Sequence, residues 1–357
     1  MILGEKMVHS TASTTAKLSV VSSSASIGKS TQKTSQSNAI SLATLWARNY
    51  FVSVNTRNDA NQALQAESIS EATSKAGRLQ TTDRLKANLS LCSAQAWSMT
   101  ENLLSDEIRR HGIDPALINP WEIAADSHKL FERTLIAYGD RVTPRRLSVL
   151  IGNEFGQVRA KYTENDPRAI GFVSMQFHYT GQMLLELLSA PERLLVEPYF
   201  KVMDDHLYMP LRAAYSAAAN HDYQSPALQA VHHLLPLTTK IAFNVCQQVS
   251  RQHPGYQTYN GALTSPTVRT SSIRDVEMFQ VYLCLCVLED SIQSVQRELF
   301  PLCVMLYPRL NVSWRLVQDM LQQIGWEMHD RLPPDHAATF LPYLRTLIEM
   351  FSAEVFA

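Results

Sequence analysis

Asp204, Asp205 and His206 are adjacent residues whose carboxylate and imidazole side chains are common ligands of metal ions. Consecutive residues of a helix point in different directions, so these three side chains are not expected to converge on one ion. Metal centres in helical proteins draw further ligands from Glu-x-x-His pairs on neighbouring helices, and the sequence shows no such partner helix. We therefore predict no metal site.

The chain has five cysteines: Cys92, Cys246, Cys284, Cys286 and Cys303. Their odd number and the absence of a CxxC pair argue against a disulfide framework and a cysteine-based zinc site, and they indicate a reducing compartment. Cys284 and Cys286 lie two positions apart on an expected helix, hence on different faces. We interpret the cysteines as small buried hydrophobic residues.

Motifs of familiar catalytic centres are missing from the sequence. It has no Gly-x-Ser-x-Gly elbow, no His-Glu-x-x-His motif, no GxGxxG fingerprint and no P-loop. His232 and His233 are adjacent and point apart, and the WEMHD segment is typical of the polar end of a helix. We therefore predict that the protein is not an enzyme.

A more informative pattern runs from Pro254 to Asp275, PGYQTYNGALTSPTVRTSSIRD. A loop that begins with proline leads to Ser272–Asp275, expected at the start of a helix over 271–290, and an acidic turn follows at Glu289–Asp290. The next helix has Glu298, Leu299, Met305, Leu306, Tyr307 and Leu310. In this order the elements resemble those of phycobiliproteins, the light-harvesting relatives of the globins, although the family usually has Gly-Asp at the acidic turn.

The resemblance implies roles for three positions. Ser272 occupies the place of the family cysteine that forms a thioether to the bilin, Arg274 matches the arginine that pairs with a bilin propionate, and Asp275 matches the aspartate that accepts hydrogen bonds from pyrrole N–H groups. A hydroxyl is a far poorer nucleophile than a thiolate, so the resemblance implies no covalent bilin but leaves non-covalent contact open. The alternative is structural: Asp275 interacts with the dipole of the first helical turn and Arg274 pairs locally.

The elements that must position these residues are helices. Apolar residues recur at helical spacing through most of the chain, prolines such as Pro120 and Pro144 precede or open them, and no strand alternation of useful length occurs. Pro210 is expected to break a long helical stretch, and Ser313 and Asp335 are expected to be N-caps. The predicted class is all-α. Haem in the usual globin geometry is not expected, because the helix expected at 291–310 has no histidine to ligate iron.

Three regions follow from composition and resemblance. Residues 1–78 are predicted to be a mostly disordered Ser/Thr-rich tail and linker, in which Leu42, Leu45, Trp46 and Tyr50 have the spacing of a short docking helix. Residues 79–189 are predicted to form a helical N-terminal region. Residues 190–357 are predicted to form a phycobiliprotein-like, globin-like helical domain.

Overall composition limits the partners. The net charge is -1 and charged residues make up 18%, so no strong field exists to attract nucleic acid or anionic lipid. No apolar run approaches the roughly 20 residues that span a bilayer. We expect a cytoplasmic protein, including the cytoplasmic face of thylakoids, with protein partners.

Two functions remain open at this point. The first is a phycobiliprotein-like interaction or regulatory protein without a chromophore, associated with the phycobilisome light-harvesting system and binding phycobiliproteins or a second copy of itself. A stripe of Leu194, Leu195, Tyr199, Val202 and Leu207 would face the partner or pack in the core. The alternative is a sensor or carrier that holds a bilin or another apolar ligand without a covalent bond.

Overall fold

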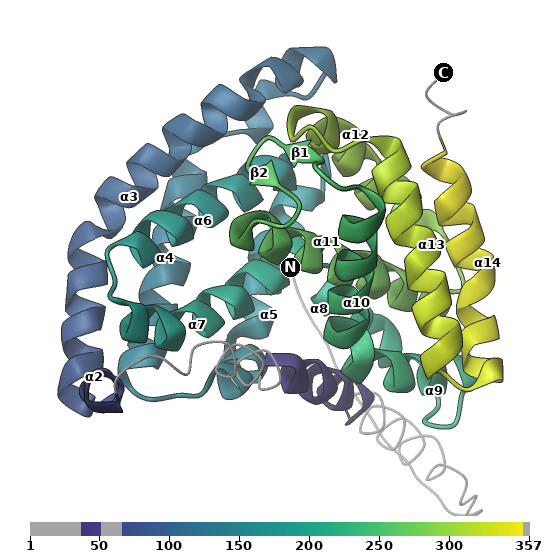
Figure 1. The fold of residues 1–357 in the computed structure, drawn as a ribbon, viewed down its shortest axis with the longest axis horizontal. Helices are drawn as coiled ribbons and strands as arrows, with labels where there is room; N and C mark the ends of the chain where they lie inside the picture. The colour runs from purple at the N-terminus through teal and green to yellow at the C-terminus, as the bar shows by residue number, and fades with distance from the viewer. Residues whose placement is uncertain (1–36, 51–65, 353–357) are drawn as a thin grey trace, which may run out of the picture.

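The computed structural model describes residues 37–50 and 66–352 (Figure 1). The helices are 37–50, α2 (Ala66–Thr73), α3 (Lys75–Arg110), α4 (Pro120–Gly139), α5 (Pro144–Thr163), α6 (Ala169–Glu186), α7 (Ala190–Tyr208), α8 (Leu211–Ala218), α9 (Pro226–Leu234), α10 (Thr238–Gln252), α11 (Pro266–Glu289), α12 (Phe300–Arg309), α13 (Trp314–Arg331) and α14 (Pro334–Met350). A π-helical turn, Val295–Leu299, precedes α12, and 3₁₀ turns cover Pro115–Leu117 and Leu235–Leu237. The two-residue strands β1 (Gln257–Thr258) and β2 (Gly261–Ala262) form an antiparallel hairpin. The predicted all-α class is confirmed.

Most helix boundaries follow the expected capping chemistry. Ser313 is the N-cap of α13, and its Oγ accepts a hydrogen bond from Leu316 N at 3.3 Å. The helical stretch breaks at Pro210, between α7 and α8. The prediction that Asp335 caps α14 is wrong, because the helix begins one residue earlier at Pro334, whose fixed φ suits the first helical position.

Helix α11 begins earlier than residue 271, where the sequence placed its start. Ser265 is the N-cap, its Oγ accepts from Val268 N at 3.4 Å, and Pro266 is the first helical residue. Asp275 consequently lies in the third turn. The helix dipole acts mainly within the first turn, so the dipole explanation for an acid at this position does not apply.

The predicted docking helix is present at 37–50. It buries Leu42, Trp46 and Tyr50 completely or almost so, and its two ends are held by Asn38 and Asn49, which donate to the carbonyls of His221 and Leu235. The tail predicted before it lies outside the described residues. Part of the predicted linker, residues 66–78, is helical in the structure: it comprises α2 and the first turn of α3.

The described helices form two groups with α11 between them (Figure 1). Helices α3, α4 and α6 lie on one side of the view, and α10, α13 and α14 lie on the other. Helix α7, predicted to open the C-terminal domain, packs chiefly against α5 and α6 of the first group. Tyr199, Val202 and Leu207 of its apolar stripe are buried, so this part of the stripe is core within the chain.

Helix α6 is buried on several sides. Phe177 stacks on Phe131 of α4 with ring centroids 5.7 Å apart. Gly171 permits the close approach of α12, because a Cβ atom at this position would lie 2.7 Å from Met305 Cε. The packing of α6 thereby joins the first group of helices to the second.

Candidate functional site

Helix α11 presents different functional side chains on two of its faces. Residues three positions apart lie on the same face of a helix, so Ser272 shares a face with Asp275. Arg274 and Glu277 are likewise three positions apart and share another face. The structure therefore separates the three residues that the resemblance singled out: Ser272 and Asp275 stay together, and Arg274 points elsewhere.

The face with Ser272 and Asp275 lines a pocket of about 70 Å3 between α10, α11, α13 and the hairpin loop. Its walls are mostly apolar, and the residues that line it are Cys246, Val249, Ser250, Thr258, Asn260, Leu263, Val268, Ser271, Ser272, Asp275, Tyr307, Leu310, Val312, Leu316, Val317 and Met320. Among these described residues Asp275 is the only acidic or basic one. An apolar pocket with a few polar groups at one place is the usual form of a small-molecule site.

The loop that closes one side of this pocket is fastened to the turn between α12 and α13. Tyr259 N donates to Leu310 O at 2.9 Å, and Asn311 Nδ2 donates to Gln257 O at 2.6 Å. Tyr256 Oη donates to Asn311 O at 3.0 Å and accepts from Ser313 N at 2.8 Å. The wall of the pocket is therefore a hydrogen-bonded unit formed by two segments about fifty residues apart.

Asp275 is a largely buried carboxylate beside Arg274 and Tyr208. Its side chain is 19% exposed, and within residues 37–50 and 66–352 its Oδ1 atom accepts no hydrogen bond. Arg274 Nε lies 4.0 Å from Oδ1, too far for a hydrogen bond. Burial raises the pKa of Asp275 to about 6, and the positive charge of Arg274 and a hydrogen bond from Tyr208 oppose this rise. The carboxylate is thus largely ionised at neutral pH.

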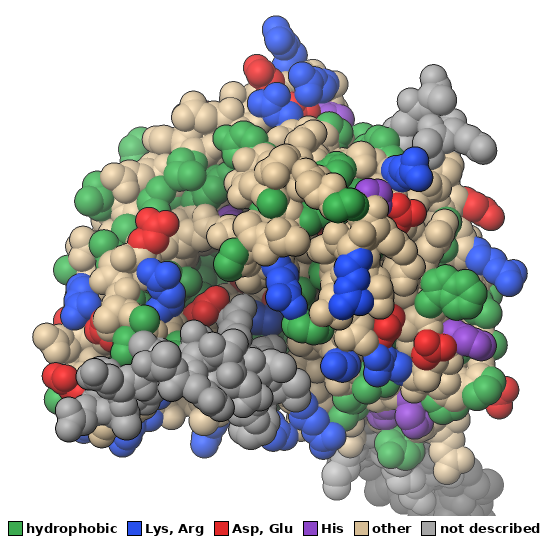
Figure 2. All heavy atoms as spheres, viewed as in Figure 1, with side chains coloured by type: hydrophobic (Ala, Val, Ile, Leu, Met, Phe, Trp, Pro, Cys, Tyr) green, Lys and Arg blue, Asp and Glu red, His purple; other side chains and the backbone are tan. Residues whose placement is uncertain are grey.

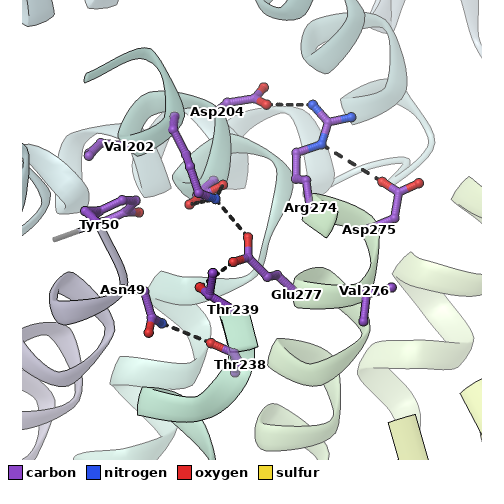
Figure 3. A network of polar contacts seen from close by, with 12 residues as sticks. Asn49, Tyr50, Val202, Asp204, Thr238, Thr239, Arg274, Asp275, Val276 and Glu277 are labelled. Carbon is purple, nitrogen blue, oxygen red and sulfur yellow. Dashed lines mark hydrogen bonds and ion pairs between the residues drawn. The ribbon is translucent and has the colours of Figure 1, made fainter. Parts of the chain in front are cut away.

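Arg274 lies between two carboxylates (Figure 3). Its Nη1 donates to Asp204 Oδ2 of α7 at 2.6 Å, and its guanidinium lies over the ring of Tyr208 at 4.3 Å from the centroid. Arg274 therefore joins α11 to α7 and is not among the residues that line the pocket. With Asp204 and Asp275 ionised, the group of three carries one net negative charge.

The same face of α11 contributes Glu277, labelled in Figure 3, to a buried ionic triad with Lys201 and Asp205. Lys201 Nζ donates to the two oxygens of Asp205 at 3.0 and 2.9 Å and to Glu277 Oε2 at 2.8 Å. Thr239 Oγ1 donates to Glu277 Oε1 at 2.6 Å. Burial raises the pKa of Asp205 above its ordinary value, against the attraction of Lys201.

Helix 37–50 covers this triad. The ring of Tyr50 lies 6.0 Å from Lys201 Nζ, and Tyr50 Oη accepts a hydrogen bond from Trp46 Nε1 at 2.9 Å. Asn49 Nδ2 donates to Thr238 Oγ1 at 2.9 Å. The next residue, Thr239, donates a hydrogen bond to Glu277 of the triad. The triad is therefore enclosed by helix 37–50, α7, α10 and α11, which are far apart along the chain.

Asp204, Asp205 and His206 point to three different places, as the sequence predicted. His206 interacts with Val202 O at 2.8 Å through Nδ1 and lies 3.4 Å from Ser148 Oγ through Nε2. Burial lowers the pKa of His206 to about 4, so its imidazole is neutral at pH 7. In the part of the chain that the structure describes, no group of three His, Cys, Asp or Glu side chains could hold a metal ion.

All five cysteines are free and buried, as predicted. Burial raises the pKa of the Cys246, Cys284, Cys286 and Cys303 thiols, which makes them poor nucleophiles at neutral pH. No described helix is both long enough and apolar enough to cross a membrane.

Comparison with protein-family models, with curated proteins and with solved structures finds no match to this chain. The motifs quoted above are therefore the sole support for the resemblance to phycobiliproteins.

Proposed function

We propose that this protein is a non-enzymatic sensor or carrier that binds a small ligand reversibly in the pocket beside Asp275. The observation that carries the proposal is a mostly apolar pocket in which Asp275 is the only acidic or basic residue among the described residues that line it. The hydrogen-bonded loop wall supports it further, because a preformed wall lowers the entropy lost on binding. Ser272 offers only a hydroxyl, so attachment of the ligand is non-covalent in this proposal.

The ligand that fits best is smaller than a tetrapyrrole. A cavity of about 150 Å3 is known to take a benzene molecule, and this pocket has about 70 Å3. A bilin would have to extend well beyond the pocket, and Arg274 is already engaged with Asp204. Non-covalent binding of a bilin can be tested by coexpression with the enzymes of bilin synthesis. If a bilin binds, the purified protein would be coloured and would lose its colour on denaturation.

Methyl NMR tests the general proposal. Met320 lines the pocket and its resonance can be assigned with the Met320→Leu variant, while the 41% exposed Met99 on α3 serves as an internal control. A library of small apolar compounds is expected to include members that shift the Met320 methyl resonance in a saturable way and leave Met99 unchanged. Failure of every compound to do so would refute the proposal.

A second candidate is the phycobiliprotein-like interaction or regulatory protein of a light-harvesting system, at the cytoplasmic face of thylakoids. Two large apolar side chains favour a binding role for the surface: Trp121 is 86% exposed and Trp326 is 65% exposed. On the face shown in Figure 2, apolar, acidic and basic side chains are interspersed, which suits protein contacts better than a polyanion. Capture of phycobiliproteins by the wild-type chain, lost in Trp121→Ala or Trp326→Ala, would support this candidate.

A further inference from the structure

The charge around the pocket limits what can bind there. Arg274 is shared by Asp204 at 2.6 Å and Asp275 at 4.0 Å, so two carboxylates face one guanidinium. The guanidinium lies on the α7 side, and the pocket itself is lined by Asp275 and by no basic side chain among the described residues. A ligand in the pocket therefore meets an excess of negative charge at one end.

The remaining walls limit the shape of the ligand. Val249, Leu263, Val268, Val317 and Met320 present methyl and methylene groups. By comparison with a cavity of about 150 Å3 that holds the six carbons of benzene, about 70 Å3 has room for roughly three non-hydrogen atoms, enough for a short alkyl group. Tyr307 also lines the pocket, and aromatic rings attract cations.

We infer that the pocket selects a small alkylammonium cation, with the ammonium group on Asp275 and the alkyl group against the valine and leucine side chains. This inference rests on the proposed function, since it names the ligand class of the same pocket. An ammonium group offers three N–H donors and one positive charge, which match the carboxylate that Asp275 contributes to the pocket wall. An anion or an N–H-free neutral molecule of the same size lacks both features.

A matched pair of probes tests the inference. n-Propylammonium chloride and 1-propanol have the same number of non-hydrogen atoms and differ in the charged group. Titrations of the whole chain at constant ionic strength, followed by the Met320 methyl resonance, are expected to give at least about tenfold tighter binding of n-propylammonium, because hydrogen bonds to charged groups are the stronger ones. Sodium chloride alone is expected to cause no shift.

A variant pair extends the test. Asp275→Asn is expected to weaken n-propylammonium binding at least about tenfold and to leave 1-propanol binding within about twofold. Asp330→Asn removes an exposed carboxylate of α13 and is expected to change neither. Should Asp275→Asn not fold, the comparison of the two probes on the wild-type chain still decides.

Two results would overturn the inference in distinguishable ways. Equal binding of 1-propanol and n-propylammonium would reject the cationic ligand class and leave the proposed function standing. If no compound of any class shifts the Met320 resonance, the proposed function fails and the inference fails with it.

Discussion

Replacing Lys201 with Met removes the single positive charge from a buried triad and keeps most of the aliphatic side chain. Lys201 is 17% exposed, and the carboxylates that it contacts, Asp205 and Glu277, are 1% and 0% exposed. At an effective dielectric constant of about 20, each contact near 3 Å has an attraction of about 5 kcal/mol, which is partly offset by the cost of desolvating the ions. The variant leaves two buried carboxylates without a cation.

We expect Lys201→Met to lower the free energy of unfolding by about 3–5 kcal/mol at pH 8. The loss should be smaller at pH 5. A carboxyl group that is buried without a cation has a raised pKa, so the folded variant binds a proton at the lower pH and the unpaired charge disappears. Urea unfolding at the two pH values, followed by far-ultraviolet circular dichroism, measures both effects.

Lys161 provides the matched control. Its Nζ also contacts two carboxylates, Glu122 at 2.6 Å and Asp126 at 2.7 Å, but its side chain is 41% exposed. Lys161→Met is expected to cost less than about 1 kcal/mol. A loss for Lys201→Met that is no larger than for Lys161→Met, or that does not depend on pH, would refute the reasoning about the buried triad.

Three further variants test other parts of the structure. Burial lowers the pKa of His206 to about 4, below its ordinary value of 6.5. The unfolded chain therefore binds the proton first, and the wild type should lose about 3 kcal/mol of stability from this group as the pH falls from 6.5 to 4. His206→Gln should remove this component from the pH profile of urea unfolding, whereas the exposed control His329→Gln should leave it unchanged. Gly152→Ala would place a Cβ atom 2.7 Å from His206 Nε2, so we expect a loss of about 1–3 kcal/mol in the same assay. Trp46→Ala should cost about 3–5 kcal/mol and release helix 37–50, which limited proteolysis detects as new cleavage within the helix.

Local chemistry predicted much of the helical organisation. Pro120, Pro144 and Ser313 mark helix starts because capping and the fixed φ of proline act within one turn. The start of α11 was missed because Ser265–Pro266 lies inside a stretch rich in turn residues, where Ser-Pro is equally typical of a loop. The helices over 66–78 were missed because their residues are polar, and their stability comes from packing on α3 and α7 rather than from their own composition.

The site was predicted in part. Ser272 and Asp275 were singled out by a motif, and their spacing places them on one face of any helix. The pocket itself also needs Cys246 and Tyr307, which are separated by about sixty residues, and no local pattern joins them. Lys201 left a signal that could have been used, since Lys201 and Asp205 are four residues apart on a helix.

Within little more than one turn, from Ser272 to Glu277, helix α11 contributes side chains both to the pocket and to the contacts with α7. Asp275 lies on the pocket face, whereas Arg274 and Glu277 on the other face hold Asp204 and Lys201 of α7. Asp275 Oδ1 and Arg274 Nε are 4.0 Å apart, so a cation bound to Asp275 would compete with Arg274 for the carboxylate and leave Arg274 more fully to Asp204. A ligand in the pocket would thereby strengthen the contact between α11 and α7, beside the triad that helix 37–50 covers.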